Sequence, residues 1–83
     1  MGISCGASLI IGKTIVGIIE KKNTQGTSPA SQIFLLFSDN TNYEFYSSDR
    51  IRGTSDIGVG GNNEVRRYGE GTMEIVFESF VPE

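Results

Sequence analysis

The sequence has no histidine and no tryptophan, and it has one cysteine and two prolines. Histidine is the commonest general base and a frequent metal ligand, so its absence excludes the Ser-His-Asp triad and the usual zinc sites. A single cysteine excludes a disulfide within the chain, whereas small secreted domains normally carry several paired cysteines. We therefore expect a cytoplasmic protein that binds no metal, uses no cofactor and is not an enzyme.

Long apolar runs and excess positive charge are also missing. No stretch approaches the roughly 20 apolar residues of a transmembrane helix, so we expect no membrane span. Seven basic residues stand against ten acidic ones, and the formal charge is −3. Proteins that bind nucleic acids without sequence preference present a basic face to the phosphates. We therefore expect no general nucleic-acid binding.

The 83 residues predict one small domain, 1–83, because larger chains are needed to support two cores. Four runs rich in β-branched and aromatic residues predict strands: 14–20, 33–37, 43–46 and 72–80. The second and third runs flank a polar tip and form a predicted hairpin, 31–48. Residues 62–69 predict a short helix with an asparagine as N-cap and Gly69 after its end. Residues 7–13 fit either one helical turn or an early start of the first strand.

The fold class that follows is mainly β, a small α+β domain. We expect about four antiparallel strands in a curled sheet or half-barrel, with one short helix before the last strand. The run 33–37 is apolar on both faces and predicts a central strand covered on both sides. In the last strand Met73, Ile75 and Phe77 are expected to face the core, opposite Glu74 and Glu78.

Such a sheet leaves apolar area that one short helix cannot cover. The chain also lacks the disulfides and metal sites that often stabilise small domains. We therefore expect a homodimer or a higher homo-oligomer, with a second copy packed against the sheet.

The segment "DIGVGGNNEVRRYGEGT", residues 56–72, has the composition of an anion-binding loop. Glycine lets the main chain approach a ligand, a helix N-terminus offers free N–H groups, and arginine pairs with phosphate or carboxylate. The candidate ligand-binding residues are Arg50, Arg52, Gly60, Gly61, Asn62, Arg66 and Arg67. The alternative is a turn that only starts a helix, with the arginines paired internally to Asp49, Asp56, Glu64 and Glu70.

A second phosphate-binding pattern does not hold. Gly12, Lys13 and Thr14 end like a P-loop, but Ala7 stands where that motif needs glycine, and a strand follows in place of a helix. Cys5 has no cationic neighbour in sequence to lower its pKa, so we assign it no role.

Two functional hypotheses follow. The first is a non-catalytic, oligomeric binding module that recognises an anionic small molecule, such as a nucleotide, or an acidic surface through residues 50–67. The alternative is an acidic protein-protein inhibitor, an immunity or anti-defence factor that blocks a basic partner such as a nucleic-acid-handling enzyme. The arginines would matter for the first hypothesis, and Glu44, Glu74 and Glu78 for the second. An enzyme that uses carboxylates or tyrosines is the least favoured possibility.

Overall fold

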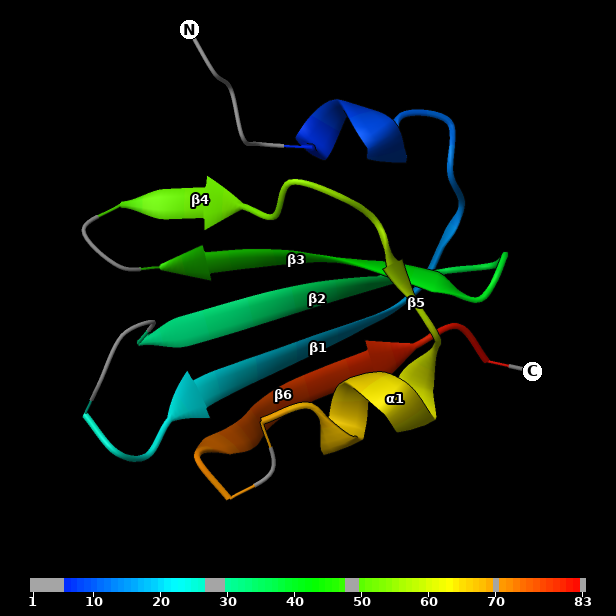
Figure 1. The fold of residues 1–83 in the computed structure, drawn as a ribbon. Coiled ribbons are helices and arrows are strands. Elements are labelled where there is room, and N and C mark those ends of the chain that lie inside the picture. The colour runs from blue at the N-terminus through cyan, green and yellow to red at the C-terminus, as the bar shows by residue number, and fades with distance from the viewer. Residues whose placement is uncertain (1–5, 27–29, 48–49, 70, 83) are drawn as a thin grey trace, which may run out of the picture.

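The computed structural model describes residues 6–26, 30–47, 50–69 and 71–82 and consists mainly of one antiparallel β-sheet (Figure 1). Cys5 lies outside these residues. The elements are η1 (Ala7–Ile10), β1 (Ile15–Asn23), β2 (Ser31–Phe37), β3 (Thr41–Ser47), β4 (Ile51–Gly53), β5 (Gly58–Val59), α1 (Asn62–Arg67) and β6 (Met73–Phe80). The predicted mainly β fold, with a short helix before the last strand, is confirmed. Neither helix in the described part of the chain has the length and apolarity to traverse a bilayer.

The six-stranded sheet is open and has the order β4-β3-β2-β1-β6, with β5 paired to β3. The predicted hairpin is confirmed as β2 and β3. Its tip contains Asn40 at φ 64°, a left-handed conformation that asparagine tolerates better than most residues. The two shortest strands, β4 and β5, are additional to the four predicted ones. For residues 7–13, the helical turn is the correct alternative, since Ala7–Ile10 form a 3-10 helix.

One face of the sheet, which we call the covered face, packs against α1. Val65 of α1 is buried in a cluster with Ile19 of β1 and with Phe34 and Leu36 of β2. These three strand residues share one face because Ile19 pairs with Phe34 and alternate residues of a strand point the same way. This cluster forms the core between the helix and the sheet, while Phe37 and Tyr43 are buried on the opposite face.

The opposite face, which we call the open face, is not covered to the same extent. The strand β2 is central, as predicted, but Ile33 on this face is 40% exposed. The prediction that both faces of this strand are covered is therefore wrong at Ile33. The reason is that the only α-helix among the described residues packs on one side of the sheet.

A bulge in β6 changes which side chains of the last strand share a face. Glu20 pairs with Phe77 and Lys21 with Ile75, so Val76 has no partner of its own. An extra residue shifts the alternation of the strand by one position. Ile75 therefore lies on the covered face and Phe77 on the open face, where it is 52% exposed. The prediction that both face the core is wrong for Phe77.

The same bulge separates the two glutamates of β6. Glu74 pairs with Lys22, and Glu78 pairs with Ile19 on the covered face. The expectation that the two carboxylates share one face is therefore wrong. The N-cap of α1 also differs from the prediction, since it is Gly61 and not an asparagine.

Candidate functional site

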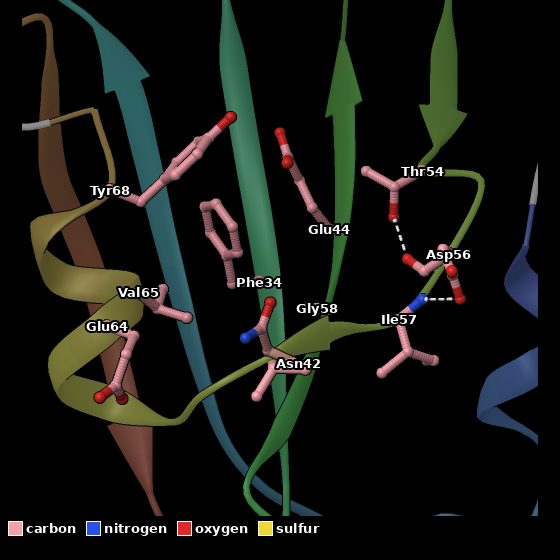
Figure 2. A pocket seen from close by; sticks show the side chains of 11 residues that line it. Phe34, Asn42, Glu44, Thr54, Asp56, Ile57, Gly58, Glu64, Val65 and Tyr68 are labelled. Atoms are coloured by element: carbon pink, nitrogen blue, oxygen red, sulfur yellow. Dashed lines mark hydrogen bonds between the residues drawn. The ribbon is translucent and has the colours of Figure 1, made fainter.

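A cavity of about 280 Å³ lies on the covered face, between α1 and the segment that joins β4 to β5 (Figure 2). Phe34 and Glu44 form its floor, from the two central strands of the hairpin. Val65 and Tyr68 line it from the helix side, and Thr54 to Val59 line it from the other. The described residues that line it are Phe34, Asn42, Glu44, Thr54, Asp56, Ile57, Gly58, Val59, Glu64, Val65 and Tyr68.

The charged side chains that line this cavity in the described chain are all acidic: Glu44, Asp56 and Glu64. Glu44 is half-buried, while the other two are exposed. In Figure 2 the carboxylate of Glu44 rises from β3 between Tyr68 and Thr54. The cavity therefore combines a carboxylate with the aromatic rings of Phe34 and Tyr68. These two rings pack edge to face, with their centres 5.8 Å apart.

Burial raises the pKa of Glu44 above its ordinary value of 4.5, and two neighbours oppose this effect. The amide of Gln32 donates to Glu44 Oε2 at 2.5 Å, and the Lys21 ammonium attracts the carboxylate. Gln32 is 4% exposed, and its Oε1 finds no hydrogen-bond partner among the residues that the structure describes. An unsatisfied buried acceptor costs about 1–3 kcal/mol, so the positioning of Glu44 has a cost to the fold.

Lys21 attaches α1 to the sheet. Its side chain is 1% exposed, and its ammonium donates to the carbonyls of Val65, Arg66 and Tyr68, the last at 2.5 Å. The last carbonyls of a helix have no intrahelical donors, and a cation at this end also interacts favourably with the helix dipole. Lys21 thereby fixes the end of the helix from which Tyr68 extends toward the cavity.

Asn42 and the glycines of the β5 segment form the other end of the cavity. Asn42 Nδ2 donates to the carbonyl of Gly60 at 2.9 Å. A Cβ added to Gly58 would lie 2.6 Å from Asn42 Oδ1, and Gly60 has φ 118°, a conformation that favours glycine. The glycine-rich sequence therefore has a structural role, because it lets the chain pass closely over Asn42 before α1.

The start of α1 uses its own carboxylate. The Gly61 N–H donates to Glu64 Oε1 at 2.8 Å. This hydrogen bond is the main reason that the pKa of Glu64 lies below its ordinary value, with the charge of Arg67 as a smaller cause. The Gly60 N–H donates to the Asn40 carbonyl at 2.9 Å. The backbone N–H groups of Gly60 and Gly61, two of the three predicted donors with Asn62, thus have partners within the protein.

The four predicted arginines occupy two separate places in the fold. Arg52 lies in β4 at one edge, where it pairs with Tyr46, and Arg50 precedes that strand. Arg66 and Arg67 lie on α1, which packs against β1 and β2 and is paired with β6 through Glu78, whereas β4 lies beyond β3 at the other edge. Figure 1 shows β4 and α1 toward opposite edges of the sheet. The fold therefore does not bring the four arginines together.

Arg66 is engaged by its neighbours. Its guanidinium forms an ion pair with Glu78 of β6 and donates through Nε–H to Asn62 Oδ1 at 2.6 Å. It also lies 5.7 Å from the Phe80 ring centre. Arg67 is exposed. Internal ion pairing, the alternative reading of the arginines, thus holds for Arg66, although its partner is Glu78 and not an acidic residue of 49–70.

Several residues of the cavity are absent from the sequence-predicted site. Phe34, Asn42, Thr54 and Tyr68 come from four separate segments, and no local motif connects them. Lys21 gives one usable signal, because it follows Gly17 and Ile19 at a spacing of two and hence lies on their buried strand face.

Within the described residues, no group of three or more His, Cys, Asp or Glu side chains has the arrangement to hold a metal ion. Comparison of the chain with protein-family models, with curated proteins and with solved structures finds no match.

Proposed function

We propose that this protein is a non-catalytic binding module whose cavity receives a cationic side chain, arginine or lysine, from a basic partner protein. The observation that carries the proposal is the cavity itself, since its charged lining residues Glu44, Asp56 and Glu64 are all acidic. A negative lining attracts a cation and repels an anion. The proposal therefore favours the inhibitor hypothesis over the anion-binding one.

The size and chemistry of the cavity support a single side chain as its occupant. Its 280 Å³ lies at the lower limit of the roughly 300–1,000 Å³ of small-molecule pockets. The exposed ring of Tyr68 offers a surface for a guanidinium or ammonium group. Glu44 supplies an ionic partner in a half-buried position, where a charge-assisted hydrogen bond is less weakened by water.

The biological role that we propose is inhibition in the cytoplasm. An acidic protein with a charge of −3 is attracted to a basic protein at long range, and complementary charge increases the rate of association. By covering the basic surface of a nucleic-acid-handling enzyme, such a module would compete with the nucleic acid for that surface. Catalysis by the module itself is not part of the proposal.

The test is a titration of the isotope-labelled protein with a blocked peptide that carries one arginine among glycines and serines, followed by amide NMR. We expect saturable shift changes at Thr54, Gly58 and Val59, which line the cavity. The same peptide with citrulline, a neutral isostere of arginine, is the control for charge. We expect no saturation with it.

Two variants with the same change in net charge make the test specific. Glu44→Gln removes the carboxylate of the cavity and should weaken binding at least about tenfold. Glu74→Gln removes a carboxylate from β6 outside the cavity and should leave binding unchanged. Equal weakening in both variants would mean that only net charge attracts the peptide, and the proposal would be wrong.

The anion-binding hypothesis predicts a different result in the same experiment. ATP as the probe would then shift the amides around Arg66 and Arg67. The variant Arg66→Ala/Arg67→Ala would abolish these shifts with little change in thermal stability. This result, together with no response to the arginine peptide, would reverse the proposal in favour of an anion site.

A further inference from the structure

The open face carries an apolar patch that spans four strands. Ile33 of β2 pairs with Phe45 of β3 and with Glu20 of β1, and Glu20 pairs with Phe77 of β6. Because paired residues share a face, these side chains lie in one row. The exposed fractions of Ile33 and Phe77 are 40% and 52%. Ile18 and Leu35, which also pair, add a second and half-buried row.

The dimensions of the molecule indicate that this face lacks a layer. The chain measures 36 × 35 × 16 Å, a thin plate. Its accessible surface is 5423 Å², compared with about 4,900 Å² expected for a monomer of this mass. A stable protein interface buries about 800 Å² on each partner, and a face of 36 by 35 Å is large enough to provide it.

The charges on this face favour a second copy as the occupant. Glu20 and Lys22 lie two residues apart on β1, on the same side of the sheet. Among the described residues, neither side chain takes part in a hydrogen bond or ion pair. A two-fold axis that passes between them would place each Glu20 near the Lys22 of the other copy, and the reverse. The Glu20 and Lys22 charges are thus complementary to those of a second copy, and Glu74, which pairs with Lys22, adds a second carboxylate beside that lysine.

We propose that two copies of this protein pack their open faces together in a symmetric homodimer. The occupant should be available wherever the chain folds, because the exposed apolar row of Ile33 and Phe77 needs cover and one cysteine provides no disulfide. A second copy of the chain meets that condition. The dimer leaves the acidic cavity free, because the cavity is on the covered face.

The test is the mass of the full chain in solution, measured by sedimentation equilibrium over a range of concentrations. We expect twice the monomer mass of 9.0 kDa. Phe77→Glu should weaken the dimer at least about tenfold, because it places a charge in the apolar row. Val81→Glu is the matched control, since Val81 is similarly exposed, at 58%, but lies beyond β6. It should remain dimeric.

A charge exchange tests the two-fold arrangement. Glu20→Lys alone and Lys22→Glu alone should each weaken the dimer, and the double variant Glu20→Lys/Lys22→Glu should restore it. A monomer at all concentrations up to the solubility limit would overturn the proposal. A dimer that withstands Phe77→Glu and does not respond to the charge exchange would also overturn it, because the interface would then lie elsewhere.

Discussion

The two faces of the sheet differ in what they bury. The covered face buries polar side chains together with its apolar core, whereas the open face leaves several apolar side chains exposed. Lys21 on the covered face is 1% exposed, whereas Phe77 on the open face is 52% exposed. Both side chains come from adjacent strands, so local hydrophobicity does not decide their burial. The position of α1 decides it.

The buried polar groups hold the elements around the cavity in place. Lys21 binds the end of α1, Asn42 binds the β5 segment, and Gln32 binds the carboxylate of Glu44. Lys21 joins β1 to α1, while Asn42 and Gln32 add side-chain hydrogen bonds between segments that already pair through their backbones. Directional hydrogen bonds therefore fix the geometry of the covered face. The open face can associate with a partner through the hydrophobic effect, which does not depend on direction.

The largest effect should come from the lysine on which this contrast depends. Lys21→Met keeps most of the buried stem but removes the donor to three carbonyls, and we expect the free energy of unfolding to fall by about 2–4 kcal/mol. Lys13→Met, at a partly exposed lysine that precedes β1, should change it by less than about 0.5 kcal/mol. Urea unfolding of both variants measures the difference. Similar losses would show that Lys21 does not anchor α1.

A steric change on the covered face should have the next largest effect. Gly58→Ala places a Cβ against Asn42 Oδ1, and we expect a loss of about 1–3 kcal/mol. In a background of Asn42→Ala the same substitution should cost clearly less, because the obstructing amide is gone. A double-mutant cycle by urea unfolding measures this coupling. Independent, additive losses would contradict the close approach of the two residues.

Glu44 should respond to pH in the direction that its environment sets. Its pKa is raised above 4.5 in the folded protein, mainly by burial. The folded state therefore favours the protonated form, and this contribution is fully present below the ordinary pKa and is lost as pH rises through the raised value. Glu44→Gln should remove that loss and give a small gain in stability at neutral pH, while it impairs peptide binding.

Unfolding of both proteins at acidic and neutral pH is the measurement. A gain confined to neutral pH would identify Glu44 as a group kept at some cost to stability, as is common in binding sites. If Glu44→Gln were less stable than the original chain at neutral pH, the carboxylate would be structural and its part in the proposed function would be doubtful.

Much of the fold was predictable from the sequence, because long alternating runs determine strands regardless of their partners. The hairpin of β2 and β3 and the helix before β6 follow from such local patterns. The face of Phe77 was not predictable, since the bulge at Val76 depends on pairing with β1. The strands β4 and β5 have three and two residues, too few to show a period.

The candidate site was less predictable than the fold. Its composition suggested seven glycine, asparagine and arginine residues of 50–67, and none of these seven lines the cavity, although Gly58 of the same segment does. The arginines, however, lie in or next to two different elements, β4 and α1. The local sequence does not show how far apart these two elements lie in the fold. Glu44 and Tyr68 line the same cavity because the end of α1 is held on β1. Lys21, which donates to the Tyr68 carbonyl, is 47 residues away from it in the sequence.

The smallest effect should come from a partly exposed lysine, Lys13, which serves as the comparison for the buried Lys21. Lys13 forms an ion pair with Asp39 at 2.5 Å, and this hydrogen bond, with a second from Thr41, lowers the pKa of Asp39 below 3.8. The stabilisation is present above that ordinary pKa and is lost as pH falls below it. Lys13→Met should change the free energy of unfolding by an amount that is barely measurable. Molar salt should remove this change, because ion pairs in contact with solvent are screened. Lys21→Met should keep its full effect in salt. If salt reduced both effects equally, Lys21 would be as accessible to solvent as Lys13, and the contrast between the two faces would not hold.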